Sequence, residues 1–350
     1  MTDPRFSRDL RRASGTRMVR GDDVSDDRDS LLNMDPPRHT RLRRIVAGAF
    51  SPRRIAGWRP RVTEITRGLA AEMADAGPPA DLVRALAFPL PVRVICELLG
   101  IPEADREHFR RWSEAALSMS TMAAEERAAA GREFREYVRA LLGEQRRSPG
   151  EALLDDLITA RDGSGSLTEA ELVSLTVNLI TAGHETTANL IATAVFTLLS
   201  EDIYRGLADE AAAAGDGFTA PEPLVEEVLR HATPAQYGMP RVALEDVDLP
   251  SGKVRRGETV LPLLARANRD PGVFPDPDAF DPGRDGAAHL TFGHGAHFCL
   301  GAGPARLEVG TALTVLLTRF PGLRAAVPPD EVSWREATLV TGPRSLAVGW

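Results

Sequence analysis

The sequence contains little cysteine, almost no lysine and no long apolar run. Cys96 and Cys299 are its only two cysteines in 350 residues, too few and too far apart for the disulfide framework of a small secreted domain. No apolar stretch is long enough to cross a bilayer, and the first residues do not resemble a signal peptide. We therefore expect a soluble cytoplasmic protein with no membrane partner.

The near absence of lysine leaves arginine to supply the positive charge. The formal net charge is −8, yet residues 38–67 carry nine arginines against one acidic residue, Glu64. This patch is either a solvated helical face or a docking surface for an acidic partner. Nucleic acid is not an expected partner, because the rest of the chain is acidic and no nucleic-acid-binding module is visible.

Apolar periodicity predicts a mostly helical chain. The predicted helices span roughly residues 39–49, 52–76, 81–99, 104–119, 123–146, 151–161 and 302–319. Residues 237–268 are typical of short strands, with PSGKVRRGE as a turn-rich connection. No internal repeat and no linker divides the chain, so we expect a single, mainly α domain over residues 1–350.

A further predicted helix is unusually long and apolar. Thr168 and Glu171 have the spacing of a capping box, and the pattern then continues without proline to Leu199. About 30 residues at 1.5 Å each give a rod of roughly 45 Å, and its apolar surface places it inside the protein.

The centre of this helix is AGHETT, residues 182–187. Its glycine costs about 1 kcal/mol relative to alanine, and Glu185 is expensive to bury without a partner. A tolerated glycine and a solvent-exposed carboxylate would explain this pattern. A local distortion of the helix that serves a function explains it better. Small residues beside a hydroxyl and a carboxylate suit oxygen activation.

FGHGAHFCLG, residues 292–301, places Cys299 in a glycine-rich turn. The cysteine could be a small buried apolar residue. It could also bind zinc together with His289, His294 and His297, although the paired spacing of structural zinc sites is missing.

A third interpretation makes Cys299 a thiolate ligand of haem iron. Gly293 and Gly295 would permit a tight turn, and Gly301 would leave room for a flat macrocycle. The amides and dipole of the helix that follows would stabilise the thiolate.

Several motifs in the expected order resemble those of the cytochrome P450 family, from about residue 3 to residue 350. The cysteine signature F-x-x-G-x-[RH]-x-C-x-G matches at Phe292, Gly295, His297, Cys299 and Gly301. The oxygen-activation signature [AG]-G-x-[DE]-T matches at Ala182, Gly183, Glu185 and Thr186. The E-x-x-R pair matches at Glu227 and Arg230, with Arg284 as its third member, and DPPRHTRLRR at 35–44 resembles the helix that contacts the haem edge.

This resemblance implies the cytochrome P450 fold, mainly α with a long central helix and small β-sheets, and haem b as cofactor. Cys299 would bind the iron, Thr186 would hydrogen-bond dioxygen, and Glu185 would help to deliver protons. The haem propionates would be held by His39, Arg43, Arg241 and His297, and further cofactor contacts would come from Ala182, Gly183, Phe292, Gly295 and Gly301. Glu227, Arg230 and Arg284 would form a structural network, since a buried charge must be paired. Cys96 would be a core residue, and His184 a spacer or outer member of a proton relay.

The implied activity is a monooxygenase acting on a small organic substrate, such as a natural-product intermediate. Its electrons would come from a ferredoxin and a ferredoxin reductase, because no flavin or iron–sulfur segment is present, and the ferredoxin would dock on Arg41, Arg44, Arg53 and Arg54. The pocket would be lined by residues 17–33, 178, 181–182, 234–237 and 339–342. The alternatives are a non-catalytic accessory protein that stabilises a partner enzyme, and a peroxide-driven enzyme.

One departure from the family concerns the start of the chain. Members normally begin with another helix and the first strands of the main sheet, before the segment that resembles MTDPRFSRDL. Without them, we expect a sheet edge near residues 259–266 to lack a partner and one side of the substrate entrance to be open. The recorded start is then either internal to a longer gene product or that of a naturally shortened member.

Overall fold

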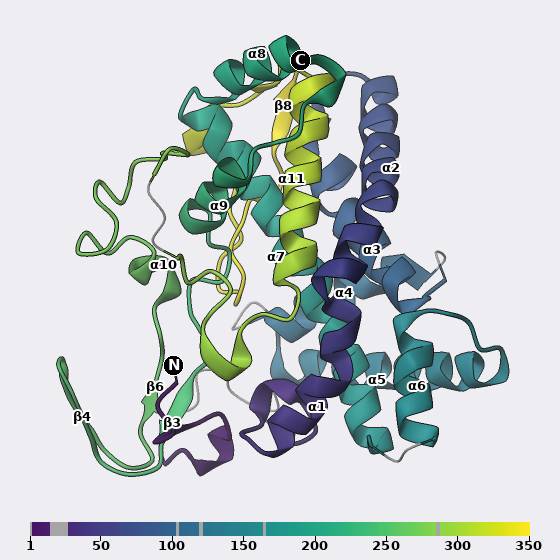
Figure 1. Ribbon diagram of the computed structural model, residues 1–350, viewed down its shortest axis with the longest axis vertical. Helices are drawn as coiled ribbons and strands as arrows, with labels where there is room; N and C mark the ends of the chain where they lie inside the picture. The colour runs from purple at the N-terminus through teal and green to yellow at the C-terminus, as the bar shows by residue number, and fades with distance from the viewer. Residues whose placement is uncertain (1, 15–26, 103–104, 119–121, 164–165, 285–287) are drawn as a thin grey trace.

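Helices dominate the computed structural model, which describes residues 2–14, 27–102, 105–118, 122–163, 166–284 and 288–350 (Figure 1). The helices are α1 (Arg38–Ala47), α2 (Pro52–Ala76), α3 (Pro89–Leu99), α4 (Arg106–Leu117), α5 (Ala124–Arg147), α6 (Leu153–Asp162), α7 (Glu169–Ser200), α8 (Tyr204–Ala214), α9 (Glu222–His231), α10 (Leu264–Ala267) and α11 (Ala302–Arg319). Among the described residues, no helix combines the length and apolar character needed to cross a membrane.

The strands are short and form three small antiparallel sheets. They are β1 (Phe6–Ser7), β2 (Ala80–Asp81), β3 (Arg241–Ala243), β4 (Val247–Leu249), β5 (Gly252–Val254), β6 (Thr259–Val260), β7 (Arg324–Ala325) and β8 (Ala347–Gly349). The strand orders are β1-β3-β6, β2-β8-β7 and β4-β5. Within the described ranges β6 pairs with β3 alone. The rest of the edge expected near residues 259–266 is partly paired, because Leu263 forms an isolated bridge with Tyr237.

The long helix α7 forms as its capping signature predicts. The Thr168 hydroxyl accepts from the Glu171 N–H at 3.1 Å, and the Glu171 carboxylate accepts from the Thr168 N–H at 3.0 Å. The expected distortion at residues 182–187 does not interrupt the helix. Gly183 is there for packing, because a Cβ at this position would lie 2.9 Å from the Ile95 side chain of α3.

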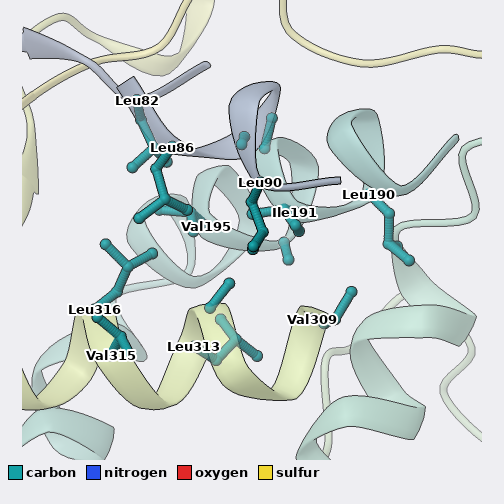
Figure 2. Close-up of a cluster of buried hydrophobic side chains, with 14 of the residues drawn as sticks. Leu82, Leu86, Leu90, Leu190, Ile191, Val195, Val309, Leu313, Val315 and Leu316 are labelled. Atoms are coloured by element: carbon teal, nitrogen blue, oxygen red, sulfur yellow. The ribbon is translucent and has the colours of Figure 1, made fainter. Parts of the chain in front are cut away.

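The core forms where α7 and α11 meet the segment before α3. Leu86 and Leu316 are fully buried, and Figure 2 shows leucines of residues 82–90 gathered with side chains of α7 and α11. Replacing one such leucine by alanine costs about 2–5 kcal/mol. The same packing fixes the start of α11, and therefore the chain just before it, against the middle of the protein.

The helix predicted over residues 81–99 is divided in the structure. Residues 80–81 form strand β2, Val83–Ala87 form a π-helical turn, and α3 begins only at Pro89. The Phe88 N–H donates to the Val83 carbonyl at 2.9 Å, while Pro89 has no N–H with which to continue an α-helical ladder. Proline therefore resets the helix at this point.

Most other boundaries agree with the prediction. Helices α1, α2, α4, α5, α6, α7 and α11 begin and end within about two residues of the predicted ranges. Helices α8, α9 and α10 were not predicted, and α10 lies in the region expected to form strands. The predicted turn at residues 250–258 contains β5, which pairs with β4 as a hairpin.

Candidate active site

Cys299 lies in a turn that glycine makes possible. Gly293 and Gly295 have φ values of 71° and 80°, in the left-handed region that is costly for other residues. The Cys299 N–H donates to the Phe292 carbonyl at 2.9 Å, which closes the turn. Helix α11 follows directly with Gly301 at its N-cap, and a Cβ at Gly301 would lie 3.9 Å from the Cys299 Sγ.

The Cys299 thiol is exposed, but nearby protein atoms affect its pKa. Cys299 is exposed, yet burial among surrounding protein atoms raises the pKa of its thiol, while the Gly301 amide and the charges of Arg43 and Arg306 lower it. The Gly301 amide, at the start of the following helix, therefore favours the thiolate, but burial outweighs it and the pKa of the thiol is raised overall.

The zinc alternative is wrong, because its members point to different partners. His289 Nε2 lies 3.2 Å from the Glu226 carboxylate, His297 Nε2 lies 3.1 Å from the Met34 carbonyl, and His294 is exposed. Across the described ranges, no three His, Cys, Asp or Glu side chains gather where they could hold a metal ion.

Basic side chains from three distant segments converge beside the cysteine turn. The His297 ring lies against the His39 ring of α1, with centroids 4.1 Å apart. Arg8, which follows β1, and Arg241, in β3, lie close enough to lower the pKa of His297. Sequence reasoning missed Arg8, because no motif surrounds it. Its guanidinium donates to the Pro240 carbonyl, which joins the first strand to the site.

Burial and like charge both lower the pKa values in this cluster. The pKa of His297 falls to about 3, first because it is buried and then because of His39, Arg8 and Arg241. The pKa of Arg8 falls to about 10, because burial and Arg241 outweigh the attraction of Asp35. The cluster thus carries an excess of positive charge that one carboxylate offsets only partly, and it favours an anionic ligand.

Two buried nitrogen atoms of the cluster indicate where that ligand would bind. His39 Nε2 and Arg241 Nε have no hydrogen-bond partner among the described residues, and a buried polar atom without a partner costs about 1–3 kcal/mol. Arg43, one turn along α1 from His39, is half-buried and interacts electrostatically with Cys299. These residues fit a cofactor that has carboxylates at one edge and meets the thiol on one face.

Helix α7 supplies a second wall with an unusual exposure pattern. Ala182 is exposed although its neighbours along the helix are largely buried. The Thr186 hydroxyl donates to the Ala182 carbonyl at 2.8 Å, so this proton is engaged in the present conformation. Ala182 and Thr186 therefore lie at the open face, whereas the Cβ direction of Gly183 faces α3. The backbone of Gly183 stays a predicted cofactor contact.

Glu185 is buried and only partly satisfied. One carboxylate oxygen, Oε2, lies 3.3 Å from Arg335 Nη1 and 3.3 Å from Asn189 Nδ2, while Oε1 has no partner among the described residues. Burial raises the pKa of Glu185, and Arg335 and Asn189 lower it. Burial outweighs these two partners, so the pKa of Glu185 is raised overall, which favours the protonated carboxyl.

The partner of Glu185 comes from a hairpin that no motif marks. The Arg335 N–H donates to the Gly342 carbonyl at 2.9 Å. A Cβ at Gly342 would lie 2.8 Å from the Asn189 Cβ, so only glycine allows this close approach to α7. The hairpin therefore places Arg335 on Glu185 through a contact that sequence spacing could not reveal.

His184 points into the protein interior. Its Nδ1 lies 2.7 Å from the Ile180 carbonyl, its ring packs edge-on against Phe88, and burial lowers its pKa to about 4. It is therefore neutral at physiological pH and takes no assigned part in the site.

The predicted structural network is present at the end of α9. Arg230 donates to both carboxylate oxygens of Glu227 at 2.7 and 2.8 Å, and Arg284 Nε lies 3.6 Å from the same carboxylate. Arg230 also donates to the carbonyls of Asn268, Pro277 and Ala279. These bonds tie α9 to the segment that leads into the cysteine turn, so the network positions that turn.

Hydrogen bonds join some of the segments that are expected to line the substrate pocket. Asn178 of α7 donates to the Ser30 hydroxyl at 2.8 Å, and the Thr341 N–H donates to the Pro234 carbonyl at 2.9 Å. Residues 17–26 of the expected lining lie outside the described residues. A surface hollow of about 420 Å³ at the end of α7, lined by residues such as Phe196 and Val332, contains none of the predicted site residues.

The arginine-rich segment is only partly free. Arg41, Arg44, Arg53 and Arg54 are all exposed. Arg41 donates to Glu171 at 2.6 Å, and Arg54 lies 3.1 Å from Asp156. A Cβ at Gly303, near the start of α11, would lie 3.4 Å from Ile55 of α2. The first turn of α2 therefore lies beside the helix that follows Cys299.

Comparison with known proteins agrees with this geometry. The family profile described as Cytochrome P450 matches residues 222–346. The chain is 43% identical over 351 residues to nocardicin C N-oxygenase of Nocardia uniformis subsp. tsuyamanensis, covering 100% of this chain and 86% of that protein. It is 43% identical over 348 residues to mycinamicin IV hydroxylase/epoxidase of Micromonospora griseorubida, covering 95% of this chain and 85% of that protein.

Solved structures give the same result. The crystal structure of HinD with NMFT and NO superposes with a TM-score of 0.92 at 43% identity, covering 100% of this chain and 86% of that one. The chain therefore belongs to the cytochrome P450 family, as a haem-thiolate monooxygenase that contains haem b and uses an organic substrate, dioxygen and electrons from redox partners.

Proposed function

We propose that this cytochrome P450 oxidises a natural-product intermediate, with Cys299 as the iron ligand and with electrons from a ferredoxin and its reductase. The observation that carries the site assignment is the exposed Cys299 thiol in the glycine turn, beside a cluster in which buried nitrogens of His39 and Arg241 have no partner among the described residues. Two relatives are named for oxidation of nocardicin C and of mycinamicin IV, which supports the substrate class.

The basic cluster would hold the two propionates of haem. His39 Nε2 and Arg241 Nε are free to donate, and Arg43 and His297 come from the same two segments as His39 and Cys299. Charge-assisted hydrogen bonds to carboxylates would relieve both the unsatisfied nitrogens and the excess positive charge. Bound haem supplies an iron centre that activates dioxygen, with electron density donated by the thiolate.

Glu185 would help to deliver protons to the active site, and Thr186 would donate a hydrogen bond to dioxygen. Glu185 can take a proton on Oε1, because burial raises its pKa and Arg335 occupies only Oε2. The Thr186 hydroxyl donates to the Ala182 carbonyl at present, and a rotation about χ1 would release it toward the open face. Arg335 is then a positioning residue, which fixes the carboxyl orientation in which Oε1 carries the proton.

The ligand assignment has a direct test. Cys299→Ala should abolish the absorption band of the reduced carbon monoxide complex that is typical of thiolate-ligated haem, while helical circular dichroism stays close to wild type. The matched control is Cys96→Ala, which removes the other thiol from the fully buried core and should keep the band. A band that persists in Cys299→Ala refutes Cys299 as the ligand.

The docking proposal concerns Arg44 and Arg53. Both are exposed, and they flank the α1–α2 connection beside the helix that follows Cys299. An acidic ferredoxin would be steered there by charge, with an association rate that falls as salt rises. Arg41 and Arg54 contribute less than expected, because each is engaged with an acidic residue.

Stopped-flow reduction by ferredoxin tests this surface. The variant Arg44→Glu/Arg53→Glu should slow reduction at low salt and leave the spectrum of bound substrate unchanged. Arg255→Glu/Arg256→Glu makes the same charge change at two exposed positions between β5 and β6 and should leave the rate near wild type. Equal low-salt rates for both double variants and wild type would show that Arg44 and Arg53 do not guide docking.

A further inference from the structure

Glu226 and Arg306 form an ion pair beside the cysteine turn. Arg306 of α11 donates to both carboxylate oxygens of Glu226 in α9, at 2.6 and 2.8 Å. The same carboxylate lies 3.2 Å from His289 Nε2, at the start of the cysteine segment. Glu226 therefore links α9 and α11 to the segment that leads to Cys299.

The contacts continue from this ion pair to the backbone of the cysteine. The Arg306 guanidinium lies over the Phe292 ring, 4.6 Å from its centroid, within the range of a cation–π interaction. Phe292 is buried, and its carbonyl accepts from the Cys299 N–H at 2.9 Å. Glu226, Arg306, His289 and Phe292 thus form a continuous set of contacts, called here the Glu226 clamp.

The clamp is partly exposed but strongly paired. The side chains of Glu226 and Arg306 are 32% and 37% exposed. Burial raises the pKa of Glu226, but Arg306 and His289 lower it to about 2, so the carboxylate keeps its charge. The neighbouring Glu227 is by contrast buried and committed to Arg230 and Arg284. The two consecutive glutamates of α9 therefore have different partners. Glu226, the more exposed of the two, contacts Arg306 and His289 beside the cysteine turn.

The clamp also places the positive charge of Arg306, partly balanced by Glu226, near the Cys299 sulfur. Arg306 favours the Cys299 thiolate electrostatically, as Arg43 does, and its bidentate bonds to Glu226 hold it in place. The positive charge of Arg306 would stabilise an added electron at the iron, and the negative charge of Glu226 would oppose that effect. The balance between these two charges would set the electrostatic field at the Cys299 sulfur.

We propose that Glu226 is a positioning residue that, through Arg306 and Phe292, holds the cysteine turn and sets the reduction potential of the haem. This inference rests on the proposal that Cys299 is the iron ligand. It predicts opposite consequences for removing the two charges, because one favours and the other disfavours reduction. A purely structural ion pair would give no such opposition of sign.

Reduction potentials of the haem-loaded protein test the charge balance. Glu226→Gln should raise the equilibrium constant for one-electron reduction about threefold or more, roughly 28 mV at 59 mV per tenfold change, and Arg306→Gln should lower it by a similar factor. Glu97→Gln is the matched control, because it removes a bidentate pair with Arg61, at 2.8 and 2.8 Å, between α2 and α3. Its potential should equal that of wild type.

The positioning role has a second readout in the reduced carbon monoxide complex. Glu226→Asp keeps the charge but shortens the side chain, so its potential should stay near wild type while its thiolate band decays faster on warming than that of Glu97→Gln. Equal decay in these two variants, or shifts of the same sign or no shifts in Glu226→Gln and Arg306→Gln, would overturn the clamp. A band that survives Cys299→Ala would instead refute the ligand assignment itself.

Discussion

Glu308 of α11 is a buried carboxyl whose ionisation should make the protein less stable as the pH rises. It is 3% exposed, and its Oε2 has no hydrogen-bond partner among the described residues. Burial, the only cause, raises its pKa from 4.5 to about 8. The folded protein therefore keeps a proton on Glu308 through the physiological range, whereas the unfolded chain releases it.

The sign and the size of the effect follow from linkage. Between pH 4.5 and about 8 the folded state binds one more proton at this group than the unfolded state, so the free energy of unfolding falls as the pH rises. The slope is about 1.4 kcal/mol for each unit of pH. The stabilising contribution is complete below pH 4.5 and is lost as the pH approaches the folded-state pKa of about 8.

Replacing Glu308 by glutamine removes the titration but keeps the size of the side chain. From pH 5.5 to 7.5, wild type should lose about 3 kcal/mol of unfolding free energy relative to Glu308→Gln. Urea unfolding of the haem-loaded proteins, followed by circular dichroism at several pH values, measures this difference. The contribution of the bound cofactor cancels when the two proteins are compared.

The control is Glu64→Gln, which removes a carboxylate that is 71% exposed and should leave the pH dependence parallel to that of wild type. Parallel curves for Glu308→Gln and wild type would refute the reasoning, because they would mean that Glu308 ionises in the folded protein as it does in the unfolded chain. A curve for Glu308→Gln that falls more steeply than wild type would contradict the sign.

Two further predictions concern α7. Thr186→Ala should keep haem and substrate binding yet lower the product formed per electron by about tenfold or more, with peroxide formed instead; Thr186→Ser is the control, and unchanged coupling would remove Thr186 from the mechanism. Gly342→Ala should cost about 1–3 kcal/mol of stability, because the new Cβ would meet the Asn189 Cβ at 2.8 Å and push the Arg335 hairpin away. Gly206→Ala, in α8 with nothing within 4 Å of its Cβ position, should not destabilise, and equal melting temperatures for the two variants would contradict this.

Local signals in the sequence determine most of the helices. The Thr168–Glu171 box predicts the start of α7, and the apolar period predicts α2 and α11 at the bounds observed. Such signals succeed because a cap or a 3.6-residue period is satisfied within a few neighbouring residues. The division at Pro89 is not predictable in this way, because one proline can kink, end or reset a helix, and packing against α7 selects among these.

The conformation of the cysteine turn is also predicted by the sequence. Gly293 and Gly295 are predicted to make a turn with unusual backbone angles, and both have positive φ values. The motif that contains Cys299 is contiguous, so the glycines that shape the turn lie close to Cys299 in the sequence. The same holds for the Glu227–Arg230 pair, three residues apart on one helix.

Only the tertiary structure decides which distant charges meet. Arg335 reaches Glu185 across 150 residues, and Arg8 reaches the Pro240 carbonyl across 232; neither arginine lies in a recognisable motif. The reason for Gly183, its contact with Ile95, likewise depends on how α3 packs on α7. Sequence patterns encode what a segment does by itself, whereas burial, the pairing of charges and the pKa values that result depend on the elements that folding brings together.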